Sequence, residues 1–330
     1  MTPSWPSTLQ IARSAGPVPA GVAIVALCLS ILLGGAATAQ APPTPGSAAE
    51  NSIAEQEPIT PVPPPPPADP RKLAIGERLF SDSRLSGAGN LSCSSCHDVH
   101  SNGARPDDGH VSRPFDTLTV FNAALNFRLN WEGNFRTLSA HIESSLENSV
   151  NMNTNADEVV GRLNADPAVV RQFQAAYGSA PDRESFLDAL VTFEKSLVTP
   201  GARFDRWLGG DASALSAAEI EGYGLFKSLG CIACHQGVNV GGNLFERQGV
   251  FRPLVKGTPQ IVRVPSLRNV ATTAPYFHDG SAATLQDAVR RMAAAQLDRT
   301  LTDEQVARLV DFLQTLTGNY HGTPVTGAQP

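Results

Sequence analysis

The chain has 330 residues, 42% of them apolar, and a net charge of −6 at pH 7. Its length suggests two domains, because single cores seldom grow beyond about 250–300 residues. Only 6% of the residues are aromatic, whereas 26 prolines and 28 glycines indicate long irregular connections. The mildly acidic balance excludes the basic surface that nucleic-acid binding requires, so no nucleic-acid partner is expected.

Residues 1–39 have the pattern of a secretory signal peptide. Arg13 supplies a positive charge, residues 20–33 are apolar but short for a bilayer span, and Ala37-Thr38-Ala39 fits an A-x-A cleavage site. An uncleaved N-terminal anchor is the alternative. Either interpretation predicts export, and the first predicts a periplasmic protein.

Residues 40–70 are rich in Ala, Pro, Ser and Glu and contain the proline run 63–67. This composition predicts a stiff, extended and solvated linker that builds no core.

From Arg71 onward, helix signals are frequent and strand-like alternation is almost absent. An apolar stripe at helical spacing follows the last helix start. We therefore expect a mostly α protein with long irregular loops. The readable helix starts are Asp166-Pro167, Ser216 with Glu219, and Thr302 with Gln305. The stripe comprises Val306, Leu309, Val310, Leu313 and Leu316.

A weak internal repeat indicates two copies of one module in tandem. Residues 76–80 and 222–226 each read as a helix that ends in Leu-Phe, and each precedes a cysteine pair. The boundary is expected near Pro200-Gly201. The expected domains are residues 71–200 and 201–323, followed by a tail at 324–330.

Both cysteine pairs belong to C-x-x-C-H motifs, at Cys93–His97 and Cys231–His235. Two thiols one helical turn apart can add to the vinyl groups of one haem, and the histidine then binds the iron. Disulfides are the default for paired cysteines in exported proteins, but here a histidine directly follows each pair. A zinc site would need a cluster of four ligands and a thioredoxin-like motif would need a βαβ context, and neither is visible. We expect two haems c, bonded to Cys93, Cys96, Cys231 and Cys234, with His97 and His235 as iron ligands.

The group at the sixth iron position decides what each haem can do, because a thioether favours electron transfer and an open position permits peroxide chemistry. Met292 lies on the apolar face of a helix expected from about Leu285 to Gln296. Core packing and iron ligation are both open for it. Each remaining histidine is a ligand, a proton donor or a surface residue.

Several further runs, in order, resemble the bacterial di-haem cytochrome c peroxidase family, which also contains the MauG-type enzymes. The resemblance covers roughly residues 71–320 and implies two cytochrome c-like haem domains in tandem. The runs are residues 79–86, the first C-x-x-C-H, 119–127, 204–208, 230–239, 265–270 and 274–280.

The resemblance implies an oxidoreductase that reduces hydrogen peroxide with electrons from a small cytochrome c or a cupredoxin. The C-terminal haem, with Met292 as sixth ligand, would accept the electrons. The N-terminal haem would be peroxidatic, with a displaceable histidine as resting ligand. His110 is the first choice for that ligand and His100 the rival.

Trp131 matches the family tryptophan that carries electrons between the haems. The family also binds calcium between the domains, and the matching positions are Asp116 and the carbonyls of Thr273 and Pro275. Family members are often homodimers, and the resemblance implies the same here.

One departure bears on catalysis. Counting from Trp131, the family has Gln and then a proton-transferring Glu, whereas this chain has His141 and Asn151. Asn cannot transfer a proton, but His141 can. A small shift in alignment would instead bring in Glu147. The departure leaves peroxidase activity open.

Two alternative functions follow. A MauG-type oxidase would modify a residue of a partner protein, but the best-known one has Tyr where Met292 stands. A non-catalytic electron carrier or redox sensor would need two six-coordinate haems and no acid–base residue.

Overall fold

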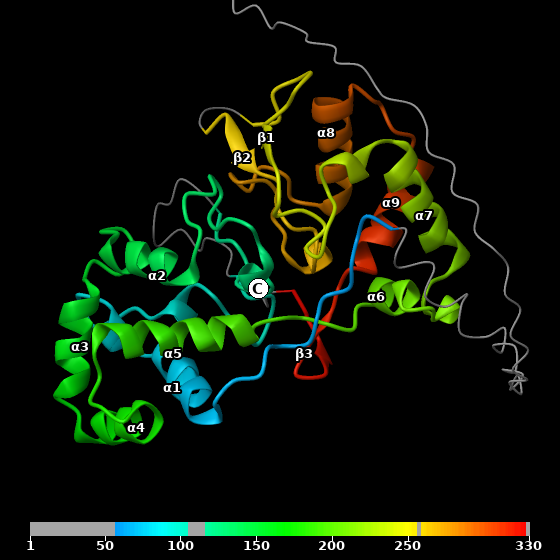
Figure 1. Ribbon diagram of the computed structural model, residues 1–330. Helices are drawn as coiled ribbons and strands as arrows, with labels where there is room; N and C mark the ends of the chain where they lie inside the picture. The colour runs from blue at the N-terminus through cyan, green and yellow to red at the C-terminus, as the bar shows by residue number, and fades with distance from the viewer. Residues whose placement is uncertain (1–56, 105–115, 256–258, 328–330) are drawn as a thin grey trace, which may run out of the picture. The chain divides into compact units, whose positions relative to one another are not determined.

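The computed structural model describes residues 57–104, 116–255 and 259–327, so the expected signal segment lies outside the described residues. The chain is mostly helical with two small antiparallel sheets, as expected (Figure 1). Within the described ranges, no helix is long and apolar enough to cross a membrane. The helices are α1 (Pro70–Phe80), α2 (Leu138–Glu147), α3 (Ala156–Asn164), α4 (Pro167–Tyr177), α5 (Arg183–Ser196), α6 (Arg203–Leu208), α7 (Ala217–Ser228), α8 (Leu285–Leu297) and α9 (Asp303–Gln314). The strands are β1 (Phe245–Arg247) paired with β2 (Ile261–Arg263), and β3 (Asn319–Tyr320) paired with β4 (Thr323–Pro324).

The structure confirms the predicted helix starts. The Asp166 side chain accepts from the Ala168 N–H at the start of α4, where Pro167 is the first residue. Reciprocal capping boxes open α7 and α9. The stripe that starts at Val306 is buried in the core around α9. Local side-chain chemistry therefore determines where these helices begin.

Two hydrophobic cores form around two helix pairs, α1 with α5 and α7 with α9 (Figure 1). A glycine lies at each crossing. A Cβ at Gly76 would overlap the Ala189 carbonyl, and a Cβ at Gly222 would overlap the Arg308 carbonyl. Only glycine allows such close approach of two helix backbones.

The internal repeat extends well beyond the two glycine helices. Asn122 and Asn269 both adopt a left-handed conformation with φ of 60°. Their N–H groups donate to equivalent carbonyls, Leu197 O at 2.7 Å and Leu316 O at 3.2 Å. Thr137 caps α2 in the first copy and Thr284 caps α8 in the second, and these threonines are as far apart in the chain as Asn122 and Asn269. Further equivalent pairs at that spacing are Asp116 and Arg263, Trp131 and His278, His141 and Ala288, and Ser145 and Met292.

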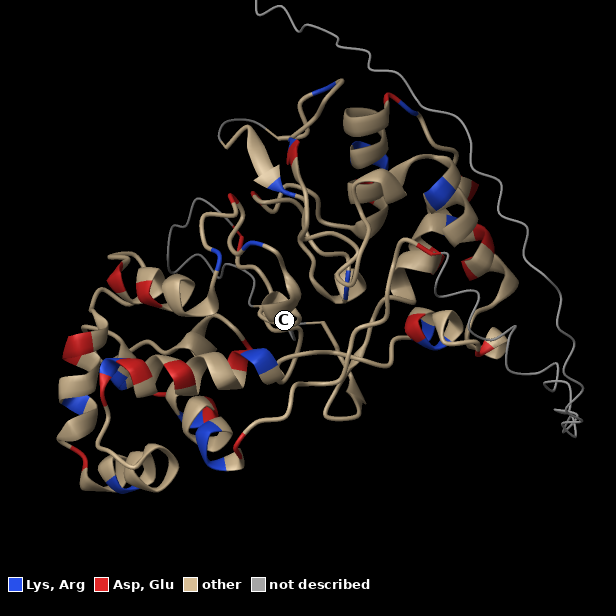
Figure 2. Cartoon of the chain, viewed as in Figure 1, with Lys and Arg blue, Asp and Glu red and all other residues tan. Residues whose placement is uncertain are grey.

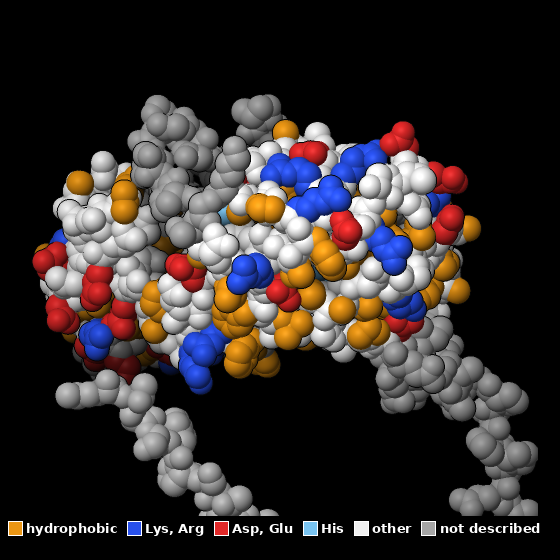
Figure 3. Space-filling view, turned by 90° about the horizontal axis from the view of Figure 1, so that it is seen from above, with side chains coloured by type: hydrophobic (Ala, Val, Ile, Leu, Met, Phe, Trp, Pro, Cys, Tyr) orange, Lys and Arg blue, Asp and Glu red, His pale blue; other side chains and the backbone are white. Residues whose placement is uncertain are grey.

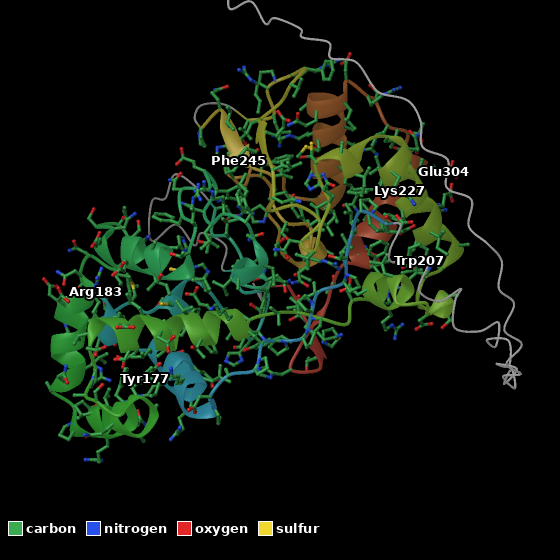
Figure 4. All side chains as sticks on the ribbon, viewed as in Figure 1. Tyr177, Arg183, Trp207, Lys227, Phe245 and Glu304 are labelled. Carbon is green, nitrogen blue, oxygen red and sulfur yellow. The ribbon has the colours of Figure 1, made fainter. Side chains whose placement is uncertain are left out.

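In the second half of the expected linker the proline run 63–67 is exposed, as expected, but two other apolar side chains, Ile59 and Val62, are buried. Ile59 is fully buried in the core around α7 and α9. Arg268 donates to the Thr60 carbonyl at 2.8 Å, and Lys227, labelled in Figure 4, pairs with Glu57 at 3.0 Å. The chain therefore contacts the C-terminal domain before it enters the N-terminal one.

A buried ion pair reinforces this contact. Charged residues are spread over the helices of both domains (Figure 2), but Arg268 and Asp205 are only 1% and 5% exposed and meet at 2.6 Å. The second Asp205 oxygen accepts from the Val62 N–H at 3.2 Å. A buried pair needs such further hydrogen bonds to compensate for its desolvation.

The C-terminal end of the chain returns from the C-terminal domain to contact the N-terminal one. Tyr320 of β3 packs against Phe121 with ring centroids 5.0 Å apart, and Val325 is buried in the core around α1 and α5. The expected tail 324–330 therefore contains a residue, Val325, that belongs to the N-terminal core.

A pair of glycine substitutions within α7 tests the close helix crossing. Gly222→Ala should destabilise the folded protein by about 1–3 kcal/mol or more, because the new methyl overlaps the Arg308 carbonyl. Gly224→Ala adds the same methyl where nothing lies within 4 Å, and should stabilise the helix by about 0.5–1 kcal/mol. Urea unfolding measures both changes, and equal effects of the two variants would contradict the crossing.

Candidate haem sites

Each C-x-x-C-H motif folds as a single tight turn. The 3-10 segments Cys93–Ser95 and Cys231–Ala233 are followed by the second cysteine and the histidine. The His97 N–H donates to Cys93 O at 2.9 Å, and the His235 N–H donates to Cys231 O at 3.0 Å. All four cysteines line one continuous cavity, and no disulfide joins them.

The two histidine rings are held in the same way. The Nδ1 of His97 lies 3.3 Å from the Gly103 carbonyl, and the Nδ1 of His235 lies 3.2 Å from the Val240 carbonyl. A carbonyl accepts only from a protonated Nδ1, which leaves Nε2 unprotonated for a metal. Burial lowers the pKa of His235 to about 4, which favours the neutral ring that binds iron.

The cavity, about 670 Å³ in volume, suits two flat apolar macrocycles. Both copies of the repeat contribute the same helix positions to its wall. Arg263 supplies a buried cation at the wall, and its Nη1 has no hydrogen-bond partner among the described residues. The two carboxylates of a haem are groups that such an unpaired cation can bind. The matched positions are Phe80, Leu138, His141, Ile142, Ser145, Leu146, Leu190 and Glu194 in the first copy, and Phe226, Leu285, Ala288, Val289, Met292, Ala293, Leu309 and Leu313 in the second.

The alternatives to haem lack support in the fold. Across the three described ranges, no group of three or more His, Cys, Asp or Glu residues could hold a metal ion, so the cysteines do not form a zinc site. Neither small sheet belongs to a βαβ unit of the thioredoxin kind. Two haems c therefore fit the residues that are present.

Met292 shares the cavity with the C-terminal C-x-x-C-H motif. It lies on the face of α8 that lines the cavity, three and four residues after Val289 and Ala288. His235, two residues after the end of η5 (Cys231–Ala233), lines the same cavity. Met152, the other methionine of the expected mature chain, is buried in the N-terminal core and also lines the cavity.

Trp131 is fixed from both sides at the junction of the two copies. Its indole N–H donates to the Asp116 carbonyl at 3.0 Å, and its own carbonyl accepts from the Arg263 N–H at 2.8 Å. The equivalent residue His278 packs edge-to-face against the indole, with ring centroids 6.3 Å apart. The Asp116 N–H donates to the His278 carbonyl at 2.7 Å, which completes a symmetrical pair of bonds.

The two residues that replace the family Gln and Glu both reach the cavity. His141 lines it from α2, and Asn151 lines it from the loop that follows. Burial lowers the pKa of His141, and the nearby Arg263 charge lowers it further. Glu147 is the last residue of α2, is exposed, and does not line the cavity, so its position does not favour the alternative that used it.

The remaining candidates have mixed outcomes. Asp116, Thr273 and Pro275 all line the cavity near Trp131, and the Ala274–Pro275 peptide is cis. His100 is exposed and does not line the cavity. His110 lies outside the described residues.

Sequence reasoning missed two charged side chains that line the cavity, the buried Arg263 and the half-buried Glu194. Arg263 lies just before residues 265–270, one of the runs that carry the resemblance. The only sequence signal for it was a single charge next to apolar residues. Glu194 interrupts the apolar face of a helix whose counterpart α9 has Leu313.

Comparisons with known proteins agree with this geometry. The family model for di-haem cytochrome c peroxidases matches residues 70–213, and the cytochrome c model matches residues 220–317. Cytochrome c551 peroxidase of Nitrosomonas europaea is 36% identical over 81% of this chain and 86% of its own length. The methylamine utilization protein MauG of Methylorubrum extorquens is 34% identical over 68% of this chain and 69% of its own length. Among solved structures, a MauG-like protein associated with microbial copper homeostasis has a TM-score of 0.65 and 27% identity, covering 78% of this chain and 93% of that one.

Replacement of one cysteine pair tests the assignment of the cavity. Mass spectrometry of the wild-type protein should show two covalent haems, and a variant with Cys93→Ala and Cys96→Ala should carry one, because the C-terminal motif is intact. Ser94→Ala changes the same turn without removing a thiol and should keep both haems. Two haems in the double-alanine variant would contradict the assignment.

Proposed function

This chain belongs to the di-haem cytochrome c peroxidase family, and we propose that it reduces hydrogen peroxide to water with electrons from a small cytochrome c or a cupredoxin. Each peroxide takes up two electrons and two protons and yields two molecules of water. The observation that carries the proposal is a difference between equivalent positions in the two copies.

Met292 and Ser145 occupy the same place on equivalent helices, and both line the cavity. A thioether at this place can bind the iron of the C-terminal haem and raise its potential. Ser145 cannot do so, and its hydroxyl donates instead to the His141 carbonyl at 2.9 Å. The N-terminal haem therefore has a position that peroxide can reach, and the C-terminal haem is suited to receive electrons.

The chain's own residues can handle the protons at the N-terminal site. The haem iron, when present, supplies the coordination position for peroxide and delivers the electrons. The lowered pKa of His141 keeps its imidazole neutral at pH 7, so the ring can accept a proton from the inner peroxide oxygen and return it to the outer one. The Arg263 guanidinium favours the negative charge that develops on the departing oxygen. Asn151 can donate a hydrogen bond but cannot transfer a proton.

Trp131 suits electron transfer between the two haems. Its indole lies at the junction of the copies, lines the cavity and is held rigidly by Asp116, Arg263 and His278. A fixed aromatic ring shortens the distance that an electron must cross in one step. Core packing and electron transfer are compatible roles for it.

The donor should bind near β1. Glu246 and Arg247 line the cavity, and the adjacent side chains Phe245 and Ile261 are 43% and 56% exposed. Figure 4 labels Phe245, and Figure 3 shows apolar and basic side chains mixed on this face. A mixed surface of this kind next to a haem suits transient contact with a small redox protein.

Calcium is a further part of the proposal. The Asp116 carboxylate and the carbonyls of Thr273 and Pro275 are the oxygen ligands that a hard cation prefers. Such an ion would hold the loop before Trp131 against the loop before His278, so its removal by a chelator should slow peroxide reduction.

We also place the protein in the periplasm as a homodimer. The signal pattern of residues 1–39 supports the first statement, and the resemblance to a family whose members are often homodimers supports the second. Light scattering of the mature protein measures the second.

The MauG-type alternative remains testable in the same protein. The replacement of the family Glu by Asn151 and the 27% identical MauG-like structure favour it, whereas Met292 favours the peroxidase. Oxidation of a residue in a partner protein, detected by mass spectrometry after peroxide addition, would distinguish the MauG-type reaction.

Ser145→Met tests the difference between the two copies. The new thioether should bind the N-terminal iron as Met292 binds the other, so peroxide-dependent oxidation of a reduced cytochrome c should fall to background while both haems stay attached. Ser144→Met places the same side chain at a position that does not line the cavity, and should keep activity. Full activity of Ser145→Met would refute the proposed site.

His141→Ala tests the proton transfer. The kcat for peroxide should fall by about 10²–10⁴, the usual contribution of a general acid–base group. In the wild type the rate should hold through pH 7 and fall only below the lowered pKa of His141, because the protonated ring can no longer accept a proton.

Two further variants test whether His141 or a carboxylate at position 147 or 151 transfers the proton. Glu147→Ala should have no effect, because this side chain does not line the cavity. Asn151→Glu in the His141→Ala background should restore part of the rate. Unchanged kcat in His141→Ala would assign proton transfer to another group.

A further inference from the structure

The two copies of the module differ at one more cavity-lining position, on the last helix of each. The glycine crossings set the correspondence, because Gly76 meets Ala189 and Phe193 while Gly222 meets Arg308 and Phe312. In this register Leu190 of α5 corresponds to Leu309 of α9, and both line the cavity. One helical turn later, Glu194 of α5 corresponds to Leu313 of α9, and both line the cavity again.

Glu194 is a carboxyl group in apolar surroundings. Its neighbours on α5, Leu190, Phe193 and Leu197, are core residues, and it forms no hydrogen bond or ion pair with any described residue. Burial raises its pKa to about 8, with no charged partner to offset the effect. The side chain is half-buried and lines the cavity.

Glu194 lies close to the first haem-attaching cysteine. Its charge contributes to the raised pKa of Cys93, whereas the C-terminal equivalent Cys231 interacts with no carboxylate. A haem joined to Cys93 would therefore lie beside Glu194 and cover it further. The C-terminal haem would face Leu313 at the same place.

The other ionisable groups on the elements packed around α5 do not act on Glu194. Glu77 of α1 acts on Tyr320, Arg263 acts on His141 of α2, and Lys72 of α1 pairs with Asp188 at 3.0 Å. The adjacent Lys195 is exposed, and Glu143 of α2 pairs with Arg183. Cys93 itself no longer titrates once it forms a thioether.

We propose that Glu194 is the redox-linked proton site of the N-terminal haem. The proposal rests on haem attachment at Cys93 and Cys96 but not on peroxide reduction. When the haem gains one electron, its net charge falls by one, and Glu194 takes up one proton from water. On reoxidation the proton leaves. A carboxylate stabilises the more positive ferric form, and a neutral acid is preferred beside the ferrous form.

The consequence is a reduction potential that depends on pH for one haem only. Between the pKa values of Glu194 in the ferric and ferrous proteins, the ferrous-to-ferric ratio at a fixed electrode potential should fall up to tenfold for each unit rise in pH, or about 59 mV for one electron. The C-terminal haem has Leu313 in place of Glu194 and should show a smaller slope in the same sample. Electron arrival at the N-terminal haem would thereby bring in a proton that peroxide reduction consumes.

Spectroelectrochemical titration of the full di-haem protein between pH 6 and 9 tests the proposal without peroxide. Glu194→Gln keeps the shape of the side chain and should abolish the slope of the N-terminal haem, and Glu194→Leu should do the same by copying Leu313. Glu246→Gln is the matched control, because Glu246 lines the cavity and interacts with Cys234 of the other copy. It should leave the N-terminal slope intact.

A wild-type N-terminal haem with no pH slope would overturn the proposal, and so would a slope that persists in Glu194→Gln with both haems attached. A slope that is lost in Glu194→Gln would support it even in a protein that fails to turn over peroxide. The outcome is therefore independent of the proposed peroxidase reaction.

Discussion

The close approach of two helix backbones determines the geometry of each haem site. Gly76 and Gly222 allow α1 and α7 to contact the carbonyls of α5 and α9 directly. This contact fixes the rotation of α5 and α9, and so decides which of their side chains reach the cavity. Leu190 and Glu194 on one side, and Leu309 and Leu313 on the other, follow from it. The C-x-x-C-H turns come shortly after α1 and α7, so the same crossings place both cysteine pairs.

A shared framework with a few different side chains gives the two sites different chemistry. Equivalent backbone bonds from Asn122 and Asn269, and equivalent threonine caps on α2 and α8, make the two copies alike. Among the matched helix positions of the cavity, three differ in kind: Ser145 against Met292, His141 against Ala288, and Glu194 against Leu313. In two of these pairs the ionisable side chain, His141 or Glu194, lies in the N-terminal copy. In the third pair the thioether that could bind an iron, Met292, lies in the C-terminal copy.

How far the sequence could predict this structure depended on the range of the interactions involved. The helix starts, the haem motifs and the repeat rest on residues close together in the chain, and they were predicted correctly. The burial of Ile59 and Val325 could not be predicted, because each side chain packs against residues that are distant in the sequence. Composition alone indicated a solvated linker around Ile59. Glu194 was missed for a similar reason, since its environment depends on a cavity formed by several helices. Glu147, which a shift in alignment had allowed, and His100 do not line this cavity. Asp116 was found only through resemblance, because a lone carboxylate is no local signal for calcium.

The division of labour between the two haems is the central claim, and one measurement tests it most directly. The protein would be poised with the C-terminal haem reduced and the N-terminal haem oxidised, then mixed with one equivalent of hydrogen peroxide in a stopped-flow spectrometer without any external donor. Rapid loss of the reduced C-terminal spectrum, together with a change at the N-terminal haem, is the expected result. A half-reduced spectrum that stays unchanged in peroxide would contradict the peroxidase and leave an electron carrier or sensor.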